Sequence, residues 1–170
     1  MESREAGLRR GEWRALALAL GLIAASTSTA VLAAELAAPP SLVELRLGHT
    51  LRGDEARREV DRLHGKGIAF RDALVAHYEG AEGIVMLYVS EAADAATAGG
   101  QVEKMTTGIR SGKGPFTHLR ERTQDGATVF SSLGQGQVHY YFRRGARVVW
   151  VAADPMLARR ALAELLQFYR

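Results

Sequence analysis

The chain has 170 residues, with 22 Lys and Arg against 19 Asp and Glu, a formal net charge of +3 at pH 7 and no cysteine. The lack of cysteine excludes disulfide bonds, CxxC redox chemistry, thiolate-ligated zinc or iron–sulfur sites, and a lipidated-cysteine anchor. The positive charge is mild, and the 130 residues that follow Pro40 are enough for one domain with a real core.

An uncharged segment of twenty residues, 15–34, follows four arginines at positions 4, 9, 10 and 14. A helix of that length rises about 30 Å, which matches the hydrocarbon thickness of a bilayer. Because cationic flanks stay in the cytoplasm, we expect residues 1–14 to be a cytoplasmic basic flank. Residues 15–38 are then a membrane anchor or signal segment that contacts the lipid bilayer through 15–34.

The alternative to an anchor is a cleaved secretory signal. Residues 15–25 would form its apolar region, and the small residues of 28–30 or 31–33 would form its cleavage site. The anchor places the chain in the bacterial cytoplasmic membrane as a single-pass protein, with its N-terminus inside and its C-terminal domain outside. The signal releases the same domain as a periplasmic or secreted protein.

A short linker and an amphipathic helix are expected next. The run of two alanines and two prolines at 37–40 is typical of a stiff spacer, so we expect a linker over 39–50 and an extracytoplasmic α+β domain over 51–170. A first helix that ends before Gly65 is indicated by one apolar stripe, Leu51, Ala56, Val60 and Leu63.

Two strands and a second helix follow. Residues 70–79 alternate loosely, and 84–89 are apolar on both faces, as in a strand covered on both sides. Ser90 is expected to cap the second helix, whose apolar residues recur at helical spacing: Ala98, Val102, Met105 and Ile109. Gly99 and Gly100 each cost about 1 kcal/mol relative to alanine, so we expect this helix to be locally loose or unusually closely packed there.

The last third of the domain is a predicted meander of four strands, 117–123, 128–133, 138–143 and 147–153. Asp125 and Gly126 favour a type I′ hairpin turn, because both central residues of that turn need positive φ. Asp154 and Pro155 then predict the start of a final amphipathic helix. The expected fold is α+β: an antiparallel sheet of five or six strands with two or three helices mainly on one face.

No catalytic, metal or cofactor motif is present. The five histidines at 49, 64, 77, 118 and 139 form no HExxH and no i, i+4 pair on a predicted helix. The glycines around Lys113 and Gln135 lack the spacing of phosphate or dinucleotide loops, and Ser131 and Ser132 lie in no nucleophile elbow. We therefore predict no catalytic residue, no metal ligand and no cofactor.

One predicted strand is unusually aromatic. His139, Tyr141 and Arg143 should share one face of it, opposite Tyr140 and Phe142. Since Tyr and Arg are favoured at interfaces, a possible interaction surface is predicted with four members, His139, Tyr141, Arg143 and Arg147. The alternative is that a helix covers this face as ordinary packing.

These features predict a membrane-anchored, non-catalytic accessory or protein-interaction module with a partner in the cell envelope. The first alternative is a small-ligand or metal-binding sensory domain, with a pocket between the sheet and the second helix lined by Met86, Tyr88, Met105 and His139. The second is a hydrolytic enzyme without a recognisable motif. Nucleic acid is not expected, because the segment 15–34 exports the domain and no RNP-like motif is present. The oligomeric state is not predicted.

Overall fold

The computed structural model describes residues 35–64, 68–112 and 114–170, which belong to one compact unit, Ala34–Arg170. The predicted cytoplasmic flank, 1–14, and residues 15–34 of the predicted anchor or signal segment lie outside the described residues. Among the residues described, no helix is long and apolar enough to cross a membrane.

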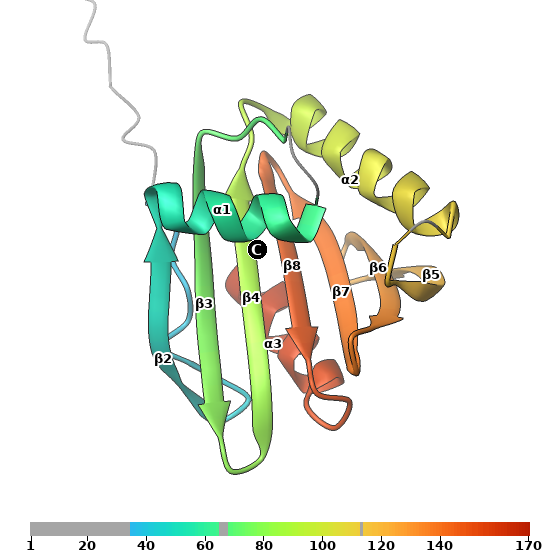
Figure 1. Cartoon of the computed structure of the whole chain (residues 1–170). Coiled ribbons are helices and arrows are strands. Elements are labelled where there is room, and N and C mark those ends of the chain that lie inside the picture. The colour runs from blue at the N-terminus through green and yellow to red at the C-terminus, as the bar shows by residue number, and fades with distance from the viewer. Residues whose placement is uncertain (1–34, 65–67, 113) are drawn as a thin grey trace, which may run out of the picture. The chain divides into compact units, whose positions relative to one another are not determined.

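The core of the domain is an eight-stranded antiparallel sheet (Figure 1). Its spatial order is β1-β2-β3-β4-β8-β7-β6-β5, so two meanders meet where β4 pairs with β8. The strands are β1 (Ser41–Leu42), β2 (Leu45–Arg52), β3 (Asp72–Gly80), β4 (Gly83–Glu91), β5 (Thr117–Gln124), β6 (Ala127–Gly134), β7 (Gln137–Arg144) and β8 (Arg147–Ala153). The predicted antiparallel α+β class is confirmed, but the predicted strand number is too low.

The missing strands are β1 and β2, which lie where a linker over 39–50 was expected. That expectation is wrong, because Leu42, Val43 and Leu45 are 0–5% exposed and belong to the core. The first helix, α1 (Gly53–His64), ends at the expected place. A β-bulge between Leu47 and His49 breaks the alternation of β2, and this irregularity hides the strand in the sequence.

The three helices cover both faces of the sheet, so the expectation of one covered face is wrong. α3 (Ala158–Phe168) packs on one face, and α1 and α2 (Ala95–Arg110) pack on the other (Figure 1). The reason is the composition of the central strands. In β8, Val149 and Val151 enter the α3-side core, whereas Val148 and Trp150 enter the core under α1 and α2.

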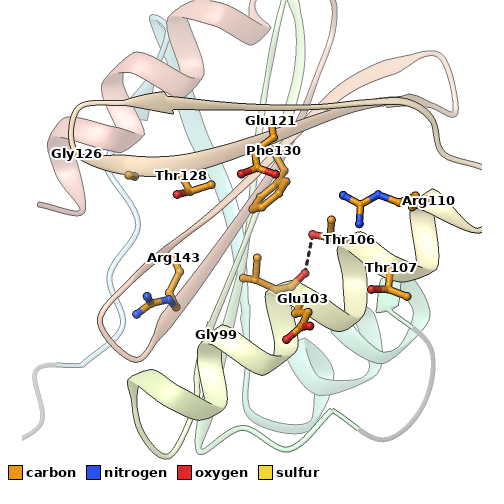
Figure 2. Close-up of a pocket in the computed structure, with 12 residues that line it drawn as sticks. Gly99, Glu103, Thr106, Thr107, Arg110, Glu121, Gly126, Thr128, Phe130 and Arg143 are labelled. Atoms are coloured by element: carbon orange, nitrogen blue, oxygen red, sulfur yellow. Dashed lines mark hydrogen bonds between the residues drawn. The ribbon is translucent and has the colours of Figure 1, made fainter.

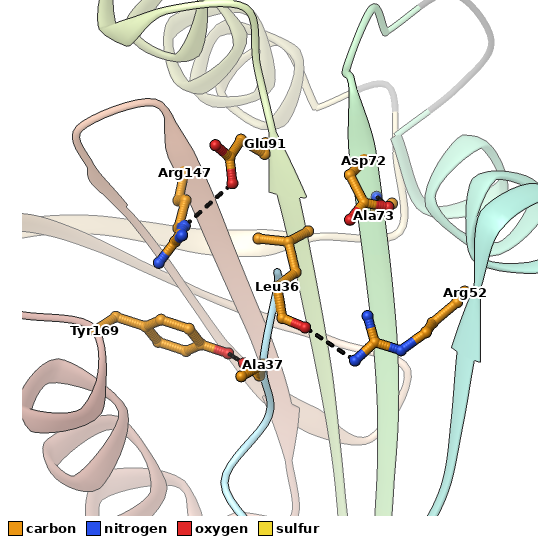
Figure 3. Close-up of polar contacts among 8 residues, drawn as sticks. All are labelled: Leu36, Ala37, Arg52, Asp72, Ala73, Glu91, Arg147 and Tyr169. Carbon is orange, nitrogen blue, oxygen red and sulfur yellow. Dashed lines mark hydrogen bonds and ion pairs between the residues drawn. The ribbon is translucent and has the colours of Figure 1, made fainter. Parts of the chain in front are cut away.

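Residues 35–40 form an extended segment, which we call the N-terminal clasp, bound across the α3 side of the sheet (Figure 3). Leu36 is 1% exposed and belongs to the α3-side core. Three side chains donate hydrogen bonds to carbonyl oxygens of the clasp: Arg52 to Leu36 at 2.9 Å, Tyr169 to Ala37 at 2.7 Å and Tyr78 to Pro39 at 2.8 Å. The proline-rich segment is therefore part of the domain rather than a spacer before it.

The predicted hairpin turn is confirmed. Asp125 and Gly126 have φ values of 48° and 72°, as a type I′ turn requires. The cap predicted for α2 is wrong: Ser90 lies within β4, and the side chain of Asp94 accepts a hydrogen bond from the Thr97 backbone N–H at 2.7 Å. The N-cap is therefore Asp94, four residues after Ser90. Its side chain accepts a hydrogen bond from a backbone N–H of the first turn that has no partner within the helix.

The start predicted for the final helix is also displaced. α3 begins at Ala158, and the side chain of Asp154 makes no capping hydrogen bond to it. One Asp154 carboxylate oxygen instead accepts from the Ile84 backbone N–H at 3.0 Å. Asp154 thus joins the end of β8 to the start of β4, and three residues separate it from the first helical residue.

A cleft between α2 and strands β5 to β7 as candidate functional site

A cleft of about 530 Å³ lies between α2 and the strands β5, β6 and β7 (Figure 2). We call it the α2 cleft. Its polar lining consists of four charged side chains, Glu103, Arg110, Glu121 and Arg143, and three threonines, Thr106, Thr107 and Thr128. Its main apolar surface is the ring of Phe130.

Helix α2 forms one wall of the cleft and is thinly packed. Its buried residues are Ala98, Val102 and Thr106, a narrow stripe for a helix of 16 residues. Glu103, Thr107 and Arg110 are on the exposed side of that stripe, next to the hairpin of β5 and β6. A narrow contact stripe leaves room beside the helix for solvent or a ligand.

The floor of the cleft is held by buried hydroxyl groups. Thr106 donates to the carbonyl oxygen of Val102 at 2.7 Å, and the Tyr141 hydroxyl lies 3.0 Å from the same Thr106 oxygen. Because the Thr106 proton is used, Tyr141 donates in the second bond. Burial raises the pKa of Tyr141, which keeps its hydroxyl protonated for this role.

An aromatic stack supports Phe130 from below. Phe130 stacks on Tyr141 with ring centroids 5.0 Å apart, and Tyr141 stacks on Trp150 at 4.9 Å. These residues are direct cross-strand partners on β6, β7 and β8. Phe130 is half-buried at the outer end of the stack, so its position in the cleft is fixed by two buried rings.

The four charged groups of the cleft are available for a ligand. Each is exposed, and within the described ranges none is ion-paired with another of the four. Arg143 donates one hydrogen bond, to the carbonyl oxygen of Gly145 at 3.1 Å, and keeps other N–H groups. The cleft therefore offers donors for an anionic group and acceptors for a cationic one around an aromatic ring.

The glycines of α2 make the helix weak rather than closely packed. A Cβ atom added at Gly100 or Gly108 would meet nothing within 4 Å, and one at Gly99 would touch only Arg143 Nε at 4.0 Å. We expect Gly100→Ala to raise the free energy of unfolding by about 0.5–1 kcal/mol, because alanine loses less backbone entropy in a helix. Urea denaturation followed by circular dichroism measures the change, with Gly108→Ala as a second instance. A destabilised Gly100→Ala variant would contradict the open surroundings of this position.

His139 and Tyr141 are not on the surface, which corrects their placement in the predicted interaction surface. They are 1% and 0% exposed. His139 accepts from the Trp150 indole N–H through Nδ1 at 3.1 Å, so Nε2 carries the proton and donates to the Gly134 carbonyl oxygen at 3.0 Å. Burial lowers the pKa of His139 and favours this neutral form. The part of β7 that carries these two side chains is therefore buried in the core. This is the alternative to an interaction surface that the sequence allows.

The two arginines of that predicted surface lie on opposite sides of the sheet. Arg143 lines the α2 cleft, whereas Arg147 pairs with Glu91 at 3.2 Å on the side of the N-terminal clasp (Figures 2 and 3). The structure therefore does not bring the four predicted residues together as one exposed patch. Of the four, Arg143 alone lines the α2 cleft.

The α2 cleft does not coincide with the ligand pocket predicted between the sheet and the second helix. None of the expected lining residues of that pocket, Met86, Tyr88, Met105 and His139, lines the α2 cleft. The sequence predicts the pairing of the 117–134 hairpin with β7, but it does not show that α2 packs against β5, β7 and β8, which decides where the cleft lies.

Ser132 and His139 are direct cross-strand partners, but they do not form a nucleophile and base. Both are 1% exposed, and both ring nitrogens of His139 are already hydrogen-bonded. A general base must be within reach of the proton that it takes and free to accept it. In the part of the chain described, no group of three or more His, Cys, Asp or Glu residues has the geometry of a metal site.

Comparison with known proteins adds no assignment to this geometry. No family model matches the chain, and neither the comparison with curated proteins nor that with solved structures gave a significant match.

Proposed function

We propose that this protein is a non-catalytic, extracytoplasmic binding module, tethered to the membrane by residues 15–34, whose α2 cleft binds a small zwitterionic ligand. The observation that carries the proposal is the lining of the cleft: two arginines and two glutamates, not paired with one another in the described residues, around the ring of Phe130. A volume of about 530 Å³ suits a ligand the size of an amino acid or a short peptide.

The chemistry of the lining defines the ligand class. Guanidinium groups bind carboxylates through charge-assisted and often bidentate hydrogen bonds, which assigns the anionic end of the ligand to Arg110 or Arg143. Carboxylates accept hydrogen bonds from an ammonium group, which assigns the cationic end to Glu103 or Glu121. Phe130 offers an apolar face for a side chain between the two ends.

The binding test starts from ligand-observed NMR on the full chain with a panel of free amino acids and di- and tripeptides. We expect zwitterionic compounds to bind and their N-acetylated, C-amidated counterparts to lose affinity. In calorimetric titration of the best compound, Arg110→Gln or Arg143→Gln should raise Kd at least tenfold, which corresponds to about 1.4 kcal/mol, and so should Glu103→Gln or Glu121→Gln. Arg159→Gln, an exposed arginine on α3, is the matched control and should leave Kd unchanged.

Two results would overturn this assignment. One is a panel in which no zwitterionic compound binds. The other is a bound compound whose affinity is the same in all four cleft variants as in Arg159→Gln, because that compound would lie outside the α2 cleft.

The tether and the extracytoplasmic location are supported by the uncharged segment 15–34 and the four arginines before it. A reporter fused after Arg170 should be active outside the cytoplasm, and mass spectrometry of the native protein should find an intact N-terminus. A reporter active in the cytoplasm would contradict the location. A mature chain that starts near residue 31 or 34 would instead indicate a cleaved signal and a periplasmic or secreted domain.

A tethered module without its own chemistry implies an envelope protein that responds to the bound ligand. This partner is part of the proposal, and a pull-down from detergent-solubilised membranes tests it. Repeated recovery of the protein alone, with and without the ligand found above, would count against an accessory role.

A further inference from the structure

Three side chains that are not part of the α2 cleft lie in one row across β2, β3 and β4. His49 pairs directly with His77, and His77 pairs directly with Met86. Directly opposed residues of antiparallel strands project from the same face of the sheet. That face is the one covered by α1 and α2, since Met86 packs against their core.

This part of the face is partly open to solvent. α1 crosses the strands near one end, and no described helix crosses the other half of β2, β3 and β4 on this side (Figure 1). Accordingly His49 is exposed, and His77 and Met86 are half-buried. An ion can therefore reach the row from solvent.

His77 carries a hydrogen-bonding atom that the described protein does not use. Its Nε2 is buried and has no hydrogen-bond partner among the residues described. A buried polar atom without a hydrogen bond costs about 1–3 kcal/mol of folding stability. Such an atom in a folded protein therefore needs an explanation. A ligand that takes the nitrogen lone pair supplies one.

The two cross-strand neighbours of His77 also carry metal-binding atoms. The His49 ring stacks on the His77 ring with centroids 4.1 Å apart and an interplanar angle of 29°. On the other side is the thioether of Met86, whose sulfur accepts the Tyr88 hydroxyl at 3.7 Å. The thioether is a soft ligand and imidazole is a common copper ligand, so this donor set favours Cu(I) over oxygen-seeking cations such as Mg²⁺ and Ca²⁺.

We propose that His49, His77 and Met86 form a binding site for one soft monovalent metal ion, Cu(I). The stacked rings do not direct their lone pairs to one point, so His49 has to rotate about its side-chain dihedrals when the ion binds. His49 is exposed and has room for this rotation, whereas His77 and Met86 are half-buried. The site is separate from the α2 cleft, and its test does not depend on the proposed ligand.

The test is a titration of the full chain with Cu(I) under anaerobic, reducing conditions, in competition with a chromophoric Cu(I) chelator. The chain has no cysteine that would compete for the ion. We expect one Cu(I) per chain, and at least tenfold weaker binding in both His49→Ala and Met86→Leu. His118→Asn, an exposed histidine on β5, and Met156→Leu, an 87% exposed methionine, are matched controls and should bind as the wild type does.

Ag(I) serves as a diamagnetic probe of the atoms involved. In ¹⁵N-labelled protein, Ag(I) should shift the Nε2 resonance of His77 and leave those of His118 unchanged. His49→Ala removes an exposed ring, so circular dichroism should show a folded protein and a loss of binding is then local. The proposal is overturned if the wild type takes up no Cu(I), if His49→Ala or Met86→Leu binds as tightly as the controls, or if Zn(II) binds as tightly as Cu(I).

Discussion

Leu36→Ala should lower the free energy of unfolding by about 2–5 kcal/mol, the range found for large-to-small substitutions in well-packed cores. Leu36 lies outside the helices and strands, but it is 1% exposed and packs in the α3-side core. The side chain fills space that α3 and the sheet would otherwise enclose. Its loss should also loosen the hydrogen bonds that Arg52 and Tyr169 donate to the N-terminal clasp.

Urea denaturation of the domain, followed by circular dichroism, measures this effect. Met156→Ala is the matched control, because Met156 is 87% exposed and its truncation should change stability by less than about 0.5 kcal/mol. Equal stabilities for Leu36→Ala and Met156→Ala would show that the clasp is not part of the folded core in solution.

His139→Leu should lower the free energy of unfolding at pH 8 by about 2–4 kcal/mol, because it removes two buried hydrogen bonds and leaves the Gly134 carbonyl oxygen without its donor. The hydrogen bond from the Trp150 indole, 3.1 Å in length, also loses its acceptor. Leucine is close to histidine in volume, so the loss reports polar contacts more than a cavity.

The same substitution should alter the pH dependence of stability. Burial lowers the pKa of His139 in the folded protein below the ordinary value of 6.5. Below about pH 6.5 the unfolded chain therefore takes up a proton that the folded protein does not, so stability falls as the pH falls. The contribution of neutral His139 to the free energy of unfolding is complete above that pH. Below it the contribution is lost progressively, with a slope of at most about 1.4 kcal/mol per pH unit.

Urea denaturation at a series of pH values from 8 down to 5 isolates this contribution as the difference between wild type and variant. The wild type should lose stability more steeply below pH 6.5 than His139→Leu does, and the exposed His118→Asn variant should follow the wild type. Parallel curves for wild type and His139→Leu would show that His139 is not held in the neutral form.

The sequence predicts the second half of the domain well because local chemistry decides it. The turn at Asp125 and Gly126 has one favourable geometry, and the strands on each side alternate clearly, so β5 to β8 form where expected. The end of α1 at His64 is also predicted from local sequence, because Gly65 follows it directly. By contrast, β2 is interrupted by a bulge and follows a turn with positive φ at Val43 and Glu44, so its pairing with β3 is visible only in three dimensions.

The location of the candidate site could not be predicted from the sequence for the same reason. Alternation correctly places His139, Tyr141 and Arg143 on one face of β7. It does not say that α2 covers Tyr141, that Phe116 packs on His139 and that Arg143 is left beside the cleft. Glu121 on β5 and Arg110 on α2 line the same cleft because of the fold, and no local sequence pattern predicts it. The row of His49, His77 and Met86 similarly depends on strand register, which a single sequence does not fix.

The N-terminal clasp also has a mechanical consequence. Glu35 forms an ion pair with Arg52, and the next residue is already in the core, so the domain has no slack at its point of entry. Tension on the backbone at Glu35 would pass directly to Arg52 of the sheet and to Tyr169 at the end of α3, because no flexible segment lies between Glu35 and the residues that they bind. The domain should therefore respond to a pull as one stiff body, and its first failure under load should be extraction of residues 35–40.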